Sequence, residues 1–160
     1  MAEVTIIEIR DGIRDTLEDA TGVIRAQAGS GTTGITEGVQ GADMPLVQVY
    51  WERSYAEEEE TRYATYGGHV QTTVHEFHAD VYAAQRSHIG ENLQQVDTMA
   101  SAIIVALQAE RTAPLFGVTD DGDEAAVKAF SWTADRSSFI YGAPETPYPG
   151  IRFVIRVWVF

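Results

Sequence analysis

The segment IRFVIRVWVF, residues 151–160, constrains the fold more than any other part of the chain. Its β-branched and aromatic residues are typical of a β-strand, in which successive side chains point to opposite faces of the sheet. One face of this strand is wholly apolar. Its residues are Ile151, Phe153, Ile155, Val157 and Val159. We therefore expect this face to lie in the hydrophobic core of a layered structure.

The other face of the same segment is mixed, because Arg152, Val154, Arg156, Trp158 and Phe160 follow one another on it. Exposing the two aromatic residues to water is costly. Arginine and aromatic residues are also enriched at protein–protein interfaces. Two interpretations stay open: the mixed face contacts another subunit, or a helix of this chain covers it.

Two segments have the periodicity of amphipathic helices, residues 4–20 and residues 87 to about 110, where Ser87 can cap the second. The apolar positions of the second segment recur at intervals of four and three. They are Ile89, Leu93, Val96, Ala100, Ile103 and Leu107. Strands are predicted at 23–28, 45–55, 70–84, 126–133 and 151–160. We expect a single α+β domain, with two helices packed on a mostly antiparallel β-sheet and mobile loops at 29–43, 56–69 and 135–150.

The charge balance excludes some partners. The 160 residues contain 11 Lys+Arg and 24 Asp+Glu, which gives a formal net charge of −13. A basic stripe that could bind nucleic-acid phosphates is not visible, and so acidic a surface repels DNA and anionic membranes. A role beside DNA stays open, because a channel through which DNA slides must not grip it. No segment approaches the roughly 18 apolar residues of a membrane span.

The segment VHEFHADV, residues 74–81, contains two histidines and two carboxylates and raises the question of a metal site. In a strand, His75 and His78 point to opposite faces and cannot bind the same ion. Glu76, His78 and Asp80 share one face, where they bind a metal only if a distant ligand completes the site. We predict a strand here, and a small metal-dependent enzyme using these three residues stays as an alternative function.

Other motifs do not predict an active site. GSGTTG at 29–34 matches the dinucleotide pattern G-x-G-x-x-G, but glycines and a proline follow it where a helix is required. The acidic turn at 119–124 does not fit the ligand spacing of an EF-hand. Neither a G-x-S-x-G elbow nor any cysteine is present. We therefore expect no catalytic residue, no cofactor and no metal ion.

The order of segments carries a resemblance. An amphipathic helix, VTIIEIRDGIRDTLEDA, is followed by the strand start TGVIRA and the proline-led strand MPLVQVYWERSYAEEE. A strand then leads into a long helix, in the segment TVHEFHADVYAAQRSHIGENLQQVDTMASAIIVAL. An acidic turn precedes a strand in TDDGDEAAVKAFSWTADR, and the last strand is IRFVIRVWVF. This layout resembles the tail-terminator (tail-completion) proteins of long-tailed bacteriophages. The resemblance covers most of the chain, while 29–43 and 135–150 look like insertions relative to compact members of the family.

The resemblance implies a structural protein without enzymatic activity. It implies a homohexameric ring that caps the tail tube, stops its polymerisation and docks the head-completion protein. The subunits can be monomers until the ring assembles on the tail. DNA passes through such a ring without sequence-specific binding. The resemblance places the protein in the virion, at the head-proximal end of the tail, after assembly in the host cytoplasm. The alternative from the same class is another neck or tail protein, such as a head-completion or tube protein.

Two sets of residues are candidates for contacts in such a ring. The acidic set is expected at the lumen or rim. It consists of Glu57, Glu58, Glu59, Glu60, Asp120, Asp121, Asp123 and Glu124. The second set, on the mixed face of the last strand, is expected at subunit contacts. It consists of Arg152, Arg156, Trp158 and Phe160.

Overall fold

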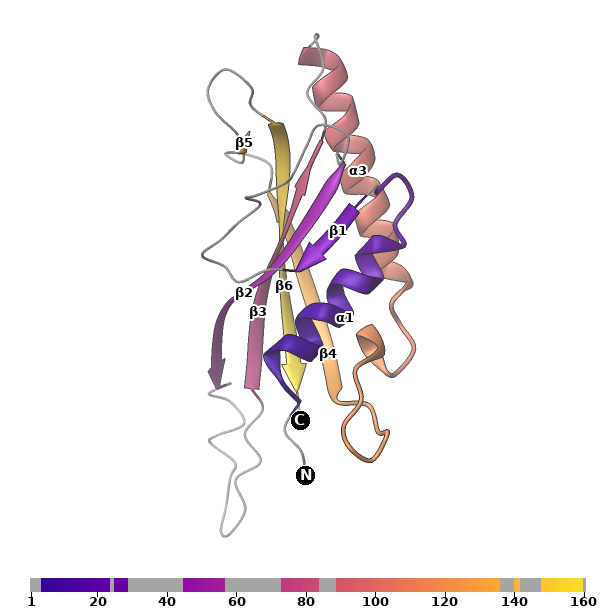
Figure 1. Cartoon of the computed structure of the whole chain (residues 1–160), viewed down its shortest axis with the longest axis vertical. Coiled ribbons are helices and arrows are strands. Elements are labelled where there is room, and N and C mark those ends of the chain that lie inside the picture. The colour runs from indigo at the N-terminus through magenta and orange to yellow at the C-terminus, as the bar shows by residue number, and fades with distance from the viewer. Residues whose placement is uncertain are drawn as a thin grey trace.

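The computed structural model describes residues 4–23, 25–28, 45–56, 73–83, 89–135, 140–141 and 148–159. Its elements are α1 (Ile6–Glu18), β1 (Arg25–Ala28), β2 (Leu46–Ala56), β3 (Thr73–Tyr82), α3 (Ile89–Ala109), the 3-10 turn η2 (Leu115–Gly117), β4 (Val127–Asp135), β5 (Ile140–Tyr141) and β6 (Tyr148–Val159). The predicted α+β fold, with two helices on a mostly antiparallel sheet, is confirmed (Figure 1).

The strands form one sheet in the order β1-β2-β3-β6-β4, and β5 pairs with the beginning of β6. Among the described strands only β1 and β2 run parallel, and every other pair is antiparallel. β3 lies in the middle of the sheet between β2 and β6. In the β3–β6 pair, Phe77 lies opposite Ile155 and Glu76 lies opposite Arg156.

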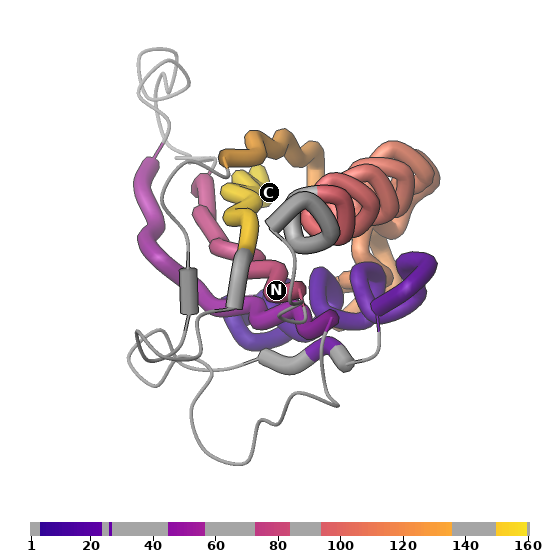
Figure 2. Tube along the Cα trace, turned by 90° about the horizontal axis from the view of Figure 1, so that it is seen from above, coloured from indigo at the N-terminus to yellow at the C-terminus, as the bar shows by residue number. Residues whose placement is uncertain are grey.

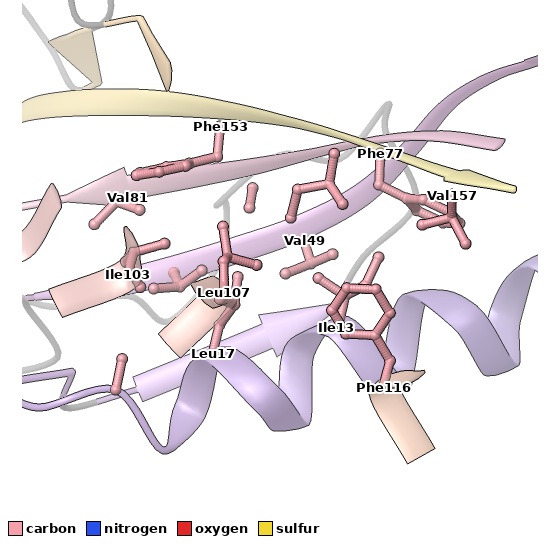
Figure 3. Close-up of a cluster of buried hydrophobic side chains, with 14 of the residues drawn as sticks. Ile13, Leu17, Val49, Phe77, Val81, Ile103, Leu107, Phe116, Phe153 and Val157 are labelled. Carbon is pink, nitrogen blue, oxygen red and sulfur yellow. The ribbon is translucent and has the colours of Figure 1, made fainter. Parts of the chain in front are cut away.

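Both described helices pack on the same face of the sheet (Figures 1 and 2). In the close-up, Phe77, Phe153 and Val157 from the strands meet Ile13 of α1 and Leu107 of α3 (Figure 3). All five side chains are buried. The apolar face of the last strand therefore lies in the core, as predicted. Its mixed face points away from both helices, so the interpretation that one of them covers that face is wrong.

Helix α1 begins at Ile6 because Thr5 caps it. The Thr5 hydroxyl accepts a hydrogen bond from the backbone N–H of Glu8 at 3.2 Å, and the Glu8 carboxylate accepts one from the backbone N–H of Thr5 at 2.7 Å. This reciprocal arrangement satisfies two amide groups that the helix itself leaves unbonded. The helix is thus two residues shorter at each end than the predicted range 4–20.

The predicted loop at 135–150 is wrong at three places. Asp135 ends β4, residues 140–141 form β5, and residues 148–150 begin β6. The prolines that indicated a loop are tolerated there, because Pro149 lies in a two-residue ladder opposite Ile140 at the start of the strand. Ala56 likewise belongs to β2 rather than to the predicted loop 56–69. The predicted cap Ser87 and the remaining residues of the three predicted loops lie outside the described residues.

Gly12 allows η2 to pack directly on α1. A Cβ at this position would overlap the carbonyl oxygen of Phe116 and would lie 3.0 Å from Cγ2 of Val118. Phe116 is held in place from its other side by the ring of Phe130, 4.7 Å away between centroids. The backbone of Phe116 has a positive φ of 55°, a conformation rare for residues other than glycine. The connection from α3 to β4 therefore depends on the missing side chain at position 12.

We predict that Gly12→Ala destabilises the protein. Alanine favours a helix over glycine by about 1 kcal/mol, but the overlap with a backbone oxygen cannot be relieved by a rotamer change. We expect a net loss of about 1–3 kcal/mol in the free energy of unfolding, measured by urea denaturation. Glu18→Ala, an exposed position of the same helix, is the control and should change stability little. A Gly12→Ala variant as stable as the control would contradict this account of the contact.

Candidate functional site

The sheet face turned away from the helices, here called the polar face, carries a network of charged side chains. As predicted, Glu76, His78 and Asp80 alternate on this face of β3, while His75 lies on the opposite face beside Phe77. The β3–β6 register places each carboxylate opposite an arginine of β6. The pairs are Glu76 with Arg156 and Asp80 with Arg152.

Asp80 is 3% exposed and is satisfied by two partners. Arg152 donates to it with Nε at 2.8 Å and with Nη2 at 3.2 Å, and the Tyr50 hydroxyl donates to Oδ2 at 2.9 Å. Burial and the neighbouring carboxylate of Asp80 both raise the pKa of Tyr50, while hydrogen bonding to Asp80 raises the pKa of Arg152. The phenol therefore stays protonated and the guanidinium charged, which keeps the buried carboxylate compensated.

The same hydroxyl determines the tautomer of His78. Tyr50 has one hydroxyl proton, which goes to Asp80, and its oxygen accepts from Nη2 of Arg152 at 3.0 Å. Nδ1 of His78 lies 3.2 Å from the same oxygen and must donate to it. Burial, and then the charge of Arg152, lower the pKa of His78. The neutral ring thus has its proton on Nδ1, and it contacts the Tyr50 ring edge-on at 5.3 Å between centroids.

Glu76 is 6% exposed and binds two arginines through one oxygen. Its Oε2 accepts from Nε of Arg156 at 3.0 Å and from Nη2 of Arg53 at 3.2 Å. Burial raises the pKa of Glu76, but the two arginine hydrogen bonds outweigh burial and the pKa is lowered below its usual value. Arg53 also lies over the Tyr55 ring, with its Cζ 5.4 Å from the centroid.

These bonds decide what the face can do chemically. The carboxylates of Glu76 and Asp80 are engaged with arginines, and Nδ1 of His78 is engaged with Tyr50. Within the described ranges, no group of three His, Cys, Asp or Glu side chains could hold a metal ion. The geometry therefore places Glu76 and Asp80 in ion pairs with arginines and His78 in a hydrogen bond with Tyr50.

A serine–histidine contact lies on the other face. Oγ of Ser54 is 2.6 Å from Nδ1 of His75, and Nε1 of Trp51 donates to the same Oγ at 2.9 Å. A catalytic serine needs a histidine that a third polar group orients. Among the described residues, Ser54 is the hydrogen-bond partner that the structure shows for His75, which also lies beside the Phe77 ring. The contact joins β2 to β3, and the described residues show no third polar group that orients His75.

The interaction residues predicted from the sequence are separated by the structure. Arg152 and Arg156 lie on the polar face of β6 with Val154 between them, and their side chains are 37% and 35% exposed. The half-buried Trp158 follows them, opposite Val74 of β3. The acidic turn lies elsewhere, before β4. Phe160, Glu57, Glu58, Glu59 and Glu60 lie outside the described residues.

The acidic turn is shaped by one of its own carboxylates. Oδ1 of Asp120 accepts from the backbone N–H groups of Gly122 at 2.8 Å and Glu124 at 3.0 Å. Asp121, Asp123 and Glu124 are exposed. Three of the four acidic residues thus point their charge to solvent, while Asp120 holds the turn.

Tyr50 and Arg53 were not predicted from the sequence as residues of this face. Strict alternation along β2 would place them on opposite faces, because they are three residues apart. A β-bulge shifts the register between Trp51 and Arg53 and brings both onto the polar face. Alternation along β2 places Tyr50 on the same face as Gln48, so the position of Tyr50 could have been predicted from the sequence. The position of Arg53 could not.

We predict that Arg152→Gln destabilises the protein more than Arg53→Ala. Asp80 loses its charged partner in the first variant, and a buried carboxylate left without one costs roughly 2–4 kcal/mol. Glu76 keeps Arg156 in the second variant, so the expected loss is about 1 kcal/mol or less. Urea denaturation of both variants measures the difference. Equal losses would show that the burial of Asp80 does not depend on Arg152.

We predict that stability falls as the pH drops below 6.5. Burial lowers the pKa of His75, and burial with Arg152 lowers that of His78, from the usual 6.5. The unfolded chain then binds more protons than the folded chain, so this stability is fully present above pH 6.5 and is lost as the pH falls. His78→Gln, which can still donate to Tyr50, should weaken the loss between about pH 6.5 and 5.5 in urea titrations. An unchanged slope in that variant would contradict the role of His78. The lowered pKa of Glu76 acts only below about pH 4.5 and does not affect this window.

None of the helices in the described ranges is both long and apolar enough to span a membrane. No family model and no curated protein matches the sequence.

Proposed function

We propose that this protein is a tail terminator of a long-tailed bacteriophage. In this role it forms a homohexameric ring on the end of the tail tube, stops tube polymerisation and provides the docking surface for the head-completion protein. It acts in the virion, at the head-proximal end of the tail, after assembly in the host cytoplasm, and it is not an enzyme.

The order and arrangement of the elements carry this proposal. An N-terminal helix, three strands, a long helix and two further long strands follow one another, and both helices pack on one face of a mostly antiparallel sheet. This is the layout on which the sequence resembles the terminator proteins.

The polar face supports a role in assembly. Neither described helix covers it, and half-exposed Arg152, Arg156 and Trp158 follow one another along β6. Arginine and tryptophan contribute strongly to protein–protein interfaces. Because the two arginines are fixed by buried carboxylates, they lose little side-chain entropy when a partner binds.

The net charge of −13 supports a ring that surrounds DNA. An acidic lumen repels the phosphate backbone, so the DNA slides past without being held. The exposed acidic turn at 120–124 is a candidate for the lumen or the rim of such a ring.

We predict that the purified protein caps tail tubes. Light scattering over a concentration series should give the mass of about six chains, or a monomer that forms one ring at a tube end when uncapped tubes are added. Electron microscopy should show tubes that stop growing once the protein is bound. A ring bound at the tube end stops growth because it occupies the surface to which the next tube subunit would add.

Three results would contradict the proposal in different ways. Spontaneous polymerisation into long tubes would indicate a tube protein instead. A stable monomer that leaves uncapped tubes growing would exclude the terminator role. A tube-end ring that fails to stop growth would point to a different neck or tail component.

A further inference from the structure

Two arginines on the polar face share a single carboxylate. Arg53 of β2 and Arg156 of β6 both donate to Oε2 of Glu76, which lies between them on β3. Each guanidinium has five N–H groups, and each uses one of them in this contact. The cluster of two arginines and one glutamate therefore has one positive charge in excess.

The excess charge is exposed. The carboxylate of Glu76 is 8% exposed, whereas the side chains of Arg53 and Arg156 are 62% and 35% exposed. The negative partner lies beneath and the N–H groups of the two arginines face outward. Such a pair matches the geometry of an external carboxylate, which arginine binds through two parallel hydrogen bonds. We call this the arginine pair.

The acidic turn has the complementary charge. Asp121, Asp123 and Glu124 are exposed, and Asp120 fixes the turn through its backbone hydrogen bonds. In the chain as a whole, acidic residues outnumber basic ones by 24 to 11. A second copy of this chain is therefore itself a source of well-placed carboxylates.

The positions of the two features favour contact between copies. Arg53 lies on β2 at one side of the sheet, and the acidic turn immediately precedes β4 at the other side. Both lie toward the end of the sheet where Ala56, Thr73, Val159 and Val127 are paired in register. In Figure 1 this is the lower end, with β2 at the left and the turn, in orange, at the right. Complementary patches on opposite sides of a subunit join copies head to tail, and such contacts form a ring when the rotation from one copy to the next closes.

We propose that the arginine pair of one subunit binds the acidic turn of the next subunit, through carboxylates that include Asp121 and Glu124. This proposal rests on the proposed ring and identifies the contact that builds it. The partner is a second copy of this chain, and each subunit contributes its turn to one neighbour and its arginine pair to the other.

Charge reversal tests the contact, and circular dichroism checks that each variant is folded. Arg53→Glu leaves Glu76 paired with Arg156. Asp121→Lys combined with Glu124→Lys leaves Asp120, which shapes the turn, and Asp123, whose φ is 58°, unchanged. Arg111→Glu is the matched control for the first variant, and Asp15→Lys with Glu18→Lys is the control for the second. All six residues that these test and control variants change are exposed.

Each test variant alone should assemble at least about tenfold more weakly than the wild type, because like charges then meet at every contact. The assay is light scattering, or ring formation on uncapped tubes if the wild type assembles only there. An equal mixture of the two variants should restore the ring. Alternating subunits then make one wild-type and one charge-reversed contact, and both are attractive. The matched controls should assemble like the wild type.

The outcomes separate this inference from the proposed function. If Arg53→Glu forms rings like the wild type, or if the mixture stays disassembled while both variants are folded by circular dichroism, the contact is wrong and the terminator role is unaffected. If the wild type caps no tubes and forms no ring, the proposed function fails and this contact fails with it. Binding of the arginine pair to tube protein alone, unaffected by the turn variant, would also overturn the contact between copies.

Discussion

The register of β3 against β6 is the constraint on which the rest of the structure depends. On the helix side it pairs Phe77 with Ile155, and on the polar side it pairs Asp80 with Arg152. Because side chains alternate along a strand, a slip of one residue would carry the carboxylates into the core and the phenylalanine out of it. Both faces of the central strand pair thus specify the same alignment. The helices can then pack on a sheet whose apolar face is complete.

The ion pairs that protect this register also determine the outer surface. Burying Glu76 and Asp80 has a desolvation cost that the attraction to arginine offsets only when the geometry is good. Here the geometry is supplied by backbone pairing, since each acid lies directly opposite its arginine on β6. The consequence is an outer face on which the carboxylates of Glu76 and Asp80 lie beneath partly exposed arginines, while the carboxylates of Glu52 and Asp135 on the same face are exposed. The positive charge of the arginines on this face contrasts with the net charge of −13 of the whole chain.

The sequence was informative wherever one periodicity extended over a whole element. It predicted the fold class, both helices, and the separation of His75 from Glu76, His78 and Asp80, because each depends on a repeat of 3.6 or 2 residues. It failed where the backbone departs from that repeat. The bulge in β2 moves Arg53 to the face of Tyr50, and prolines did not prevent residues 148–150 from extending β6. The carboxylate–arginine pairs were also not predictable, because they require the relative register of residues that lie 72 and 80 positions apart in the sequence.

In the proposed ring, identical acidic subunits would have to overcome their mutual repulsion. At physiological ionic strength, charges more than about 8 Å apart in solvent are largely screened, so only groups near the contact decide whether two copies attract. A single excess positive charge at Arg53 and Arg156 is therefore sufficient to favour one orientation, provided that acidic side chains meet it directly. The same reasoning explains why the arginines are anchored by Glu76. A flexible basic side chain in so acidic a protein would fold back on its own carboxylates, whereas an anchored one keeps its outward N–H groups available for a neighbour.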